Sequence, residues 1–313
     1  MSKFTVLDLF CGGGIGAAGL IQTRKFKIIQ AIDRNRQAVN SYNFNIGNHA
    51  IVGDLTAMSI DEFADTDGIF GGPVCHTWSI AGNGEGDKDD RGQLVWRYLG
   101  IVTFKKPKFF LFENVKGIIS KKHKPTFDKL LEKFKAIGYN VSWKLVNSWD
   151  YGVGQKRERV FIVGIREDLG FTYVFPEPKQ EDYRTQTLRS VIGDLPEPEL
   201  QVNGGHLSNN YGTDYEMANR KESWDKPGAT VTAHHRCSYT HPGEERRRFT
   251  IRECLRIQSV PDSYIFPEDM SLSAQYTIVG NGIPSKVIWY LAESLAEQLN
   301  AHKPPSGASY PSS

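Results

Sequence analysis

The amino-terminal half of the chain alternates short apolar runs with helical patterns, and this alternation constrains the fold more than any other feature. Seven runs are apolar enough to be buried strands: 4–10, 26–33, 50–54, 68–72, 108–115, 139–147 and 159–165. The clearest helix is predicted at 125–137, where Pro125 suits the first turn and Gly138 favours a stop. Strands separated by helices predict an α/β fold whose mostly parallel sheet is covered on both faces.

The remainder of the chain has a different character. Residues 167–246 are rich in Pro, Gly, Asn, Asp and His and show little periodicity, so we expect a small, loop-rich domain there. Regular structure is predicted to return at Thr250, which forms a potential capping box with Glu253, and to continue to a helix at about 285–300. We therefore divide the chain into a first domain at 1–166, the loop-rich domain, a returning segment at 247–303 and a disordered tail at 304–313.

Bulk properties exclude several classes of protein. The 313 residues carry a net charge of only +2, so an anionic partner must be met by a local patch of basic residues. No stretch approaches the roughly 20 apolar residues of a membrane span, and the first residues are too polar for a signal peptide. The four cysteines are not arranged in CxxC pairs, which favours a reducing cytoplasm.

A glycine-rich turn follows the first predicted strand, in LDLFCGGGIGAAGL (7–20). Residues 14–19 match G-x-G-x-x-G, a pattern that lets a backbone approach a ligand at the start of a helix. Asp33 ends the second strand, where a carboxylate accepts hydrogen bonds from ribose hydroxyls. The motif favours a nucleotide-type cofactor over a merely tight turn, but it does not separate a nicotinamide cofactor from S-adenosylmethionine.

Three reactive side chains are expected at one edge of the sheet. Cys75 follows the strand at 68–72, and Glu113 stands near the end of the strand at 108–115. Gln155, Arg157 and Arg159 alternate and share one face if a strand begins there. A thiol, a carboxylate whose pKa burial raises and a planar cation suit attack on an electron-poor ring. Alternatively, Cys75 is a buried apolar residue and Glu113 forms a structural ion pair with an arginine.

Six segments together resemble the DNA cytosine-5 methyltransferases, and the resemblance covers nearly the whole chain. They are DLFCGGGIGAAGL, GGPVCHTWSIAG, ENVKGI, YGVGQKRERVFIVG, RRRFTIRECLRIQSVPDSYIF and QYTIVGNGIPSKV. The resemblance implies a Rossmann-like mixed sheet that binds S-adenosylmethionine, releases S-adenosylhomocysteine and uses no metal. It also makes 1–166 the catalytic domain and 167–246 the target-recognition domain.

The same resemblance assigns the catalytic residues. Cys75 would add to C6 of a flipped-out cytosine, Glu113 would engage N3 and the exocyclic amine, and Arg159 would hold O2. Arg157 would position the catalytic loop and a phosphate. The family usually has Pro before the nucleophile and Gln after it, where this chain has Val74 and His76. Val74 lacks the fixed φ of proline, so the loop is expected to be less preorganised.

The resemblance also implies binding residues. Phe10 would stack on adenine, Asp33 would hold the ribose and Asp54 would accept from the adenine amine. The expected cofactor contacts are Phe10, Gly12, Gly14, Ile15, Asp33, Asp54, Leu94 and Asn281. The expected DNA contacts are Ser79, Gln155, Thr230, His235, Arg236 and Tyr239. The charged, glycine-rich stretch 83–92 would be a flap that closes over the base, as opposed to a solvated loop.

Two groups of polar residues have competing interpretations. His234, Cys237 and His241 have metal-like spacing, but a zinc site needs four ligands, so we favour a polar loop. A set of basic residues either neutralises phosphates or is simply solvated: Lys116, Lys121, Lys122, Lys124 and 246–248.

We therefore predict a monomeric DNA (cytosine-5)-methyltransferase of a bacterial or phage-infected cell, which acts on duplex DNA beside a separate restriction endonuclease. Three alternatives are a tRNA cytosine-5 methyltransferase, a nicotinamide-dependent oxidoreductase and a DNA-binding relative with weak catalysis. A weak similarity favours a short GC-rich palindrome as the target.

Overall fold

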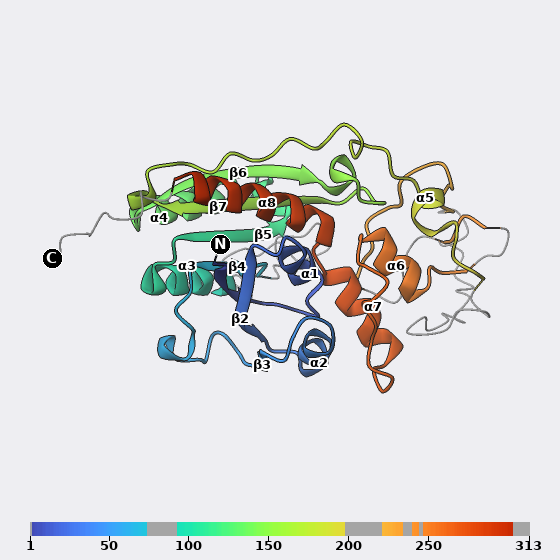
Figure 1. The fold of residues 1–313 in the computed structure, drawn as a ribbon, viewed down its shortest axis with the longest axis horizontal. Helices are drawn as coiled ribbons and strands as arrows, with labels where there is room; N and C mark the ends of the chain where they lie inside the picture. The colour runs from blue at the N-terminus through green and yellow to red at the C-terminus, as the bar shows by residue number, and fades with distance from the viewer. Residues whose placement is uncertain (1, 74–92, 198–220, 234–239, 244–246, 303–313) are drawn as a thin grey trace.

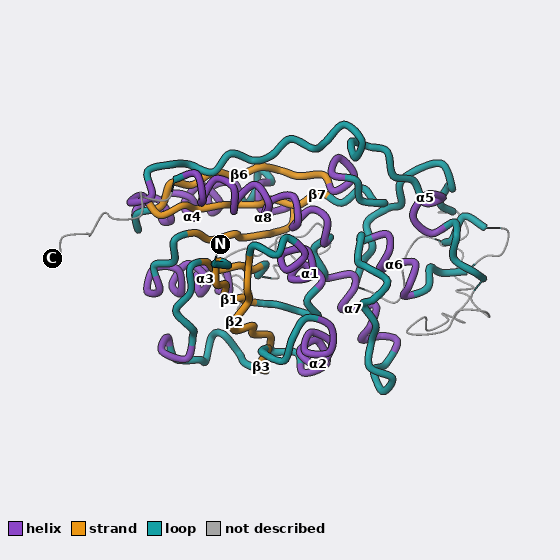
Figure 2. The backbone as a smooth tube through the Cα atoms, viewed as in Figure 1, coloured by secondary structure: helices purple, strands orange, loops and turns teal. Residues whose placement is uncertain are grey.

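A single sheet organises the molecule. The computed structural model describes residues 2–73, 93–197, 221–233, 240–243 and 247–302. Within these residues seven strands pair in the order β3-β2-β1-β4-β5-β7-β6 (Figures 1 and 2). The strands are β1 (Phe4–Leu9), β2 (Phe26–Asp33), β3 (Ala50–Val52), β4 (Gly68–Gly71), β5 (Phe109–Val115), β6 (Tyr139–Asn147) and β7 (Glu158–Arg166).

The strand directions confirm the predicted α/β fold. β1 to β5 pair in parallel, whereas β7 runs antiparallel to both of its neighbours, β5 and β6. Each of the seven predicted runs is a strand, and the observed ends differ from the predicted ones by at most two residues. A parallel sheet must be covered on both faces, which explains why its strands read as nearly continuous apolar runs.

Helices cover both faces of this sheet. The described helices of four or more residues are α1 (Ile15–Gln22), α2 (Arg36–Asn45), α3 (Gln93–Lys105), α4 (Lys124–Ala136), α5 (Leu188–Ile192), α6 (Ile251–Ile257), α7 (Leu272–Asn281) and α8 (Ser285–Ala301), with the 3₁₀ turns η4 (Lys116–Ile119) and η5 (Ser148–Tyr151). One core cluster joins α1, α2 and α8 to one face, and a second joins α3 and α4 to the other. α4 starts one residue before the predicted 125–137 helix.

The carboxyl-terminal part returns to the sheet. A third core cluster joins α5, α6 and α7 to residues of α1 and α2, and Figure 1 shows these three helices gathered at one end of the sheet. The predicted capping box is present, because Thr250 and Glu253 exchange hydrogen bonds at the start of α6. α8 then packs on α1 so closely that a Cβ atom on Gly19 would lie 1.9 Å from the carbonyl oxygen of Ser285. No helix in the described residues has the length and apolar character of a membrane span.

Candidate active site

A pocket of about 660 Å³ lies where β1, β2, β4 and β5 end. Its walls come from the turn after β1, the end of β2, residues 53–56, the start of α3 and residues 277–283. Glu113 and Gly72 line the same pocket. Ligands bind outside the carboxyl ends of the strands in open α/β sheets, and a volume of this size accommodates a nucleotide-sized molecule.

The glycine-rich turn forms one wall of the pocket. Gly12 and Gly14 have φ values of +54° and +84°, which side chains rarely tolerate, and Gly14 immediately precedes α1. The N–H of Gly12 donates to Oδ2 of Asp33 at 2.9 Å, so the turn is held to the end of β2. Ile15 begins α1 and also lines the pocket, as the sequence predicted for a ligand-facing helix start.

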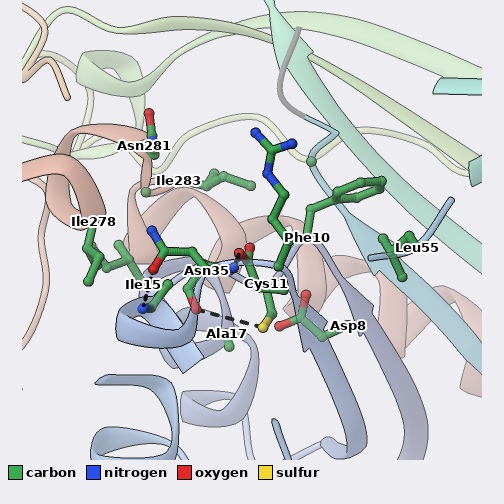
Figure 3. Close-up of a pocket in the computed structure, with 18 of the residues that line it drawn as sticks. Asp8, Phe10, Cys11, Ile15, Ala17, Asn35, Leu55, Ile278, Asn281 and Ile283 are labelled. Atoms are coloured by element: carbon green, nitrogen blue, oxygen red, sulfur yellow. Dashed lines mark hydrogen bonds between the residues drawn. The ribbon is translucent and has the colours of Figure 1, made fainter. Parts of the chain in front are cut away.

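Two carboxylates, those of Asp54 and Asp33, and the aromatic ring of Phe10 line the pocket. Phe10 and Leu55 lie together at one side of the pocket, and Ile15 and Ile278 lie at the other (Figure 3). Asp54 is exposed, and hydrogen bonds from Thr56 lower its pKa, so it is available as an ionised acceptor. Phe10 belongs to the turn after β1 that lines the pocket, and its φ of +57° is unusual for an aromatic residue.

Asp33 is the second of these pocket carboxylates. Its Oδ1 accepts from the N–H of Asn35 at 2.8 Å, while its Oδ2 is the acceptor for Gly12. Burial raises the pKa of Asp33, and the two backbone N–H groups oppose that shift. A carboxylate oxygen can accept more than one hydrogen bond and Asp33 lines the pocket, which is compatible with the predicted contact to ribose.

Asp8 is a pocket residue that sequence reasoning missed. It is only 1% exposed, lines the pocket and has an Oδ2 atom without a hydrogen-bond partner among the described residues. Burial raises the pKa of Asp8 well above the ordinary value, a hydrogen bond from Tyr42 opposes this shift, and the nearby charge of Asp33 adds to it. Side chains alternate along a strand, so Asp8 lies on the same face of β1 as the core residues Phe4 and Val6. The signal in the sequence was an acidic residue at a strand position that alternation assigns to the buried face.

Cys11 lies next to this carboxylate and also lines the pocket (Figure 3). Burial, followed by the charges of Asp8 and Asp33, raises the pKa of the Cys11 thiol well above its ordinary value. Since a thiolate is the reactive form of cysteine, this environment makes Cys11 a poor nucleophile.

Glu113 and Arg159 meet as predicted. Glu113 pairs with Phe161 across β5 and β7, and Arg159 is two residues from Phe161, so both side chains project from the same face of the sheet. The Nε atom of Arg159 lies 3.0 Å from Oε1 of Glu113. Burial raises the pKa of Glu113, which is 8% exposed, whereas the charges of Arg159 and Arg157 oppose the increase. The ion pair predicted from the sequence as the alternative to a catalytic role is therefore present, and its carboxylate lines the pocket.

Gln155 and Arg157 do not belong to the strand that carries Arg159. β7 begins at Glu158, because the N–H of Lys156 donates to the carbonyl of Gly228 and leaves the sheet. The alternation predicted for 155–159 is therefore wrong for its first part. Arg157 is 2% exposed, and its guanidinium donates to the carbonyls of Val231 and Gly280 rather than facing solvent.

Three further predicted residues can be placed. Leu94 in α3 and Asn281 at the end of α7 both line the pocket. Thr230 lies outside the pocket, and its hydroxyl donates to the carbonyl of Lys156 at 2.8 Å. This contact places Thr230 next to the residues that immediately precede β7.

Several predicted residues lie outside the described residues. They are Val74, Cys75, His76, Ser79, the flap at 83–92, His234, His235, Arg236, Cys237 and Tyr239. The chain is described up to Pro73, whose carbonyl accepts a hydrogen bond from Nδ2 of Asn114 at 3.1 Å. Asn114, the neighbour of Glu113, therefore fixes the position of Pro73, which lies two residues before Cys75 in the sequence.

The basic residues divide into two groups. Arg247 forms a buried ion pair with Glu253, with Nη2 and Oε1 2.7 Å apart, so the prediction that it neutralises a phosphate is wrong. Lys116 and Lys124 pair with Glu158 and Asp128 at the surface. Lys121 and Lys122 are exposed. In the part of the chain that can be examined, no three His, Cys, Asp or Glu side chains gather as metal ligands.

The chain matches a family model over most of its length. Residues 4–297 match the C-5 cytosine-specific DNA methylase family. Curated relatives include the type II methyltransferase M.MthTI of Methanothermobacter thermautotrophicus, 37% identical over 94% of this chain and 96% of that protein. M.FnuDI of Fusobacterium nucleatum is 35% identical over 94% of each chain. Both are described as type II methyltransferases.

Solved structures share the fold at lower identity. The Dnmt2 methyltransferase of S. pombe superposes with a TM-score of 0.75, at 19% identity over 96% of this chain and all of that one. A prophage-encoded methyltransferase of E. coli gives a TM-score of 0.76, at 20% identity over 95% of this chain and all of that one.

Proposed function

This chain belongs to the C-5 cytosine-specific DNA methylases, and we propose that it methylates C5 of a flipped-out cytosine in a specific duplex site through a covalent bond between Cys75 and C6. The family makes it a DNA (cytosine-5)-methyltransferase. The observation that carries the proposed mechanism is that one pocket is lined by both Asp54 and Glu113, and that Arg159 contacts Glu113 at 3.0 Å. The cofactor site and the proposed base-binding carboxylate thus share one cavity.

The pocket fits S-adenosylmethionine. Among the described residues the buried Oδ2 atom of Asp8 has no hydrogen-bond partner, and the cofactor carries an ammonium group that would provide one. Asp33 and Asp54 would accept hydrogen bonds from ribose and adenine, and Phe10 would pack on the adenine ring. The cofactor supplies an electrophilic methyl group. With Asn281 and Leu94 these residues would orient that methyl towards Glu113 and the target base.

Cys75 is the proposed nucleophile. It follows Pro73 by two residues, so an extended chain allows at most about 7 Å between their Cα atoms. The carbonyl of Pro73 accepts a hydrogen bond from Asn114, the neighbour of Glu113. This hydrogen bond would keep Cys75 within reach of the base that Glu113 binds. Its thiolate would form a bond to C6, which makes C5 nucleophilic. Loss of the C5 proton after methyl transfer would break the S–C6 bond and restore the aromatic ring.

Glu113 and Arg159 are the proposed base-binding pair. A protonated Glu113 would donate to N3 as electron density moves into the ring, and Arg159 would donate to O2. Because a duplex buries C6 in the base stack, the cytosine must leave the helix, at a cost of a few kcal/mol. The raised pKa of Glu113 supports this role, because it increases the fraction of the side chain that is protonated at a given pH.

Target recognition is assigned to the loop-rich domain at 167–246, with Thr230, His235, Arg236 and Tyr239 as candidates for DNA contacts. The type II relatives support a restriction endonuclease of the same specificity as a separate partner. The methyltransferase would then protect the DNA of its own cell in the cytoplasm. Among the candidate residues, arginine and threonine side chains are known to form hydrogen bonds with base edges in the major groove.

Asp8→Asn is expected to weaken S-adenosylmethionine binding by about 10- to 100-fold, the effect of losing a hydrogen bond to a charged partner. Binding requires the ionised carboxylate, and burial raises the pKa of Asp8 in the free pocket. Affinity of the unaltered protein should therefore fall as the pH drops through that pKa, whereas the variant should lack this dependence. Calorimetric titration across pH measures both effects.

Two controls make the Asp8 result specific. Asp61→Asn changes an exposed aspartate outside the pocket and should leave the affinity within about twofold, as surface changes usually do. A cofactor analogue without the amino group should bind the unaltered protein and Asp8→Asn equally. If Asp8→Asn weakens this analogue as strongly as the cofactor itself, Asp8 does not recognise the ammonium group.

The proposed function is tested by transfer of labelled methyl from S-adenosylmethionine to mixed-sequence duplex DNA, single-stranded DNA and tRNA. We expect label in duplex DNA, at C5 of cytosines within one short sequence. Label in tRNA alone would assign the chain to RNA modification. Absence of transfer to every substrate, with cofactor still bound, would contradict the proposal.

A further inference from the structure

Val231 is fastened to the catalytic domain through both of its backbone polar groups. Its N–H donates to Oε1 of Gln155 at 3.0 Å, and its carbonyl accepts from Nη1 of Arg157 at 2.9 Å. Gln155 is 0% exposed and Arg157 is 2% exposed, so neither bond competes with water. Val231 belongs to the segment 228–233, which contains Thr230 and precedes His235, the next proposed DNA contact in the sequence.

The same two side chains lead to the carboxyl end of α7. Nε2 of Gln155 donates to Oε1 of Gln258 at 3.0 Å, and the amide of Gln258 donates to the carbonyl of Val279. The Nη2 atom of Arg157 donates to the carbonyl of Gly280 at 3.0 Å. Two sets of hydrogen bonds, one through Gln155 and Gln258 and one through Arg157, therefore connect Val231 to two consecutive carbonyls of α7. We call each set a bridge. We call Gln155, Arg157, Gln258 and the groups that they join the Val231 junction.

The backbones are also in direct contact at this junction. A Cβ atom on Gly280 would lie 2.1 Å from the carbonyl carbon of Thr232 and 2.2 Å from the nitrogen of Ala233. The hydroxyl of Thr277 donates to the carbonyl of Ala233 at 3.2 Å. Only glycine permits this approach, so a side chain at position 280 must displace either the helix or the segment.

The same helix end also lines the cofactor pocket. Thr277, Ile278 and Asn281 line that pocket, together with Gly282 and Ile283 just beyond the helix. Gly280 thus contacts the segment 228–233, while its neighbour Asn281 faces the cavity. One short length of backbone is shared between the two sites.

We propose that the Val231 junction couples cofactor binding to target recognition, with Arg157 and Gly280 as its positioning residues. A cofactor that orders residues 277–283 would also fix the segment 228–233 through the two bridges. Coupling of this kind is reciprocal, so DNA bound to the recognition region would tighten the cofactor by the same factor. The inference rests on the proposed function, which supplies the cofactor and the DNA.

Hydrogen exchange tests the coupling without DNA. In the unaltered protein, saturating S-adenosylhomocysteine should slow amide exchange in residues 228–233 by at least about fivefold, since their opening then also requires α7 to move. In Gly280→Ala this slowing should disappear while the compound still binds. Thr277→Val is a milder variant that removes one hydroxyl bond, and it should reduce the slowing in part.

Gly100→Ala is the matched control, because it adds the same methyl group in helix α3 where nothing lies within 4 Å. It should preserve the full slowing. A second measurement is the ratio of S-adenosylhomocysteine affinities with and without plasmid DNA, expected to be about 5- to 150-fold in the unaltered protein and closer to one in Gly280→Ala.

The outcomes separate this inference from the proposed function. If S-adenosylhomocysteine binds but residues 228–233 exchange equally with and without it, the junction does not couple the sites. The same conclusion follows if Gly280→Ala keeps the full slowing and the full affinity ratio. If S-adenosylhomocysteine does not bind the unaltered protein at all, the proposed function fails first.

Discussion

Glu113→Gln is expected to lower the rate of methyl transfer by about 10²- to 10³-fold while S-adenosylmethionine still binds, the loss typical of a positioned proton donor. Glutamine keeps the size of the side chain and can still accept a hydrogen bond from Arg159. It cannot give a proton to N3 of cytosine. A comparison of single-turnover rates on one duplex, with cofactor affinity measured in parallel, separates chemistry from binding.

The pH dependence identifies the proton. Burial raises the pKa of Glu113, and its protonated form is the active one, so the rate of the unaltered protein should fall as pH rises through that pKa. Glu113→Gln should lose this limb of the profile. Glu158→Gln is the matched control, because Glu158 also pairs with a cation, Lys116 at 2.8 Å, but does not line the pocket. A Glu113→Gln variant that retains nearly full activity would remove Glu113 from the mechanism.

The sheet could be predicted from the sequence because its signals are local. Each strand is a continuous apolar run, and the strands β1 to β5 are separated by helical or turn segments, so composition alone identified them. The Glu113–Arg159 pair followed from the same reasoning. Both residues sit near strand ends, and adjacent strands of one sheet bring such ends together.

The errors concern contacts between distant segments. Arg157 was placed on a strand with Arg159, but residues 155 and 156 bond to Gly228 and Val231 instead of continuing β7. Nothing within the stretch 155–159 indicates that a segment some 70 residues later would compete for its backbone. Arg247 is a different case, because it was one candidate for neutralising a phosphate and its partner Glu253 lies only six residues later.

Asp8 shows a third kind of omission. Its position within a strand was predicted, but one acidic residue in an apolar run was not interpreted. The proposed role of Asp8 depends on a buried oxygen that has no hydrogen-bond partner among the described residues. This burial becomes apparent only when the surrounding helices are in place.

Cys75→Ser is expected to have the largest effect of any substitution, a loss of methyl transfer by about 10⁴-fold or more, as for the removal of other enzymatic nucleophiles. A serine hydroxyl at neutral pH is a far weaker nucleophile than a thiolate, so C6 would not be attacked. Binding of S-adenosylhomocysteine should persist, because the described pocket is built from other residues. Cys11→Ser should retain the activity, since burial keeps the Cys11 thiol protonated.

The most direct test is to trap the covalent bond. In a duplex that carries 5-fluorocytosine at the methylated position, C5 has no proton to lose after methyl transfer, so the thiol cannot be expelled. Incubation with S-adenosylmethionine, denaturation and peptide mass analysis should give one protein–DNA adduct, located at Cys75 and absent from Cys75→Ser. Transfer of methyl to ordinary duplex DNA without any adduct on the fluorinated duplex, or an adduct at Cys11, Cys237 or Cys254, would contradict the mechanism.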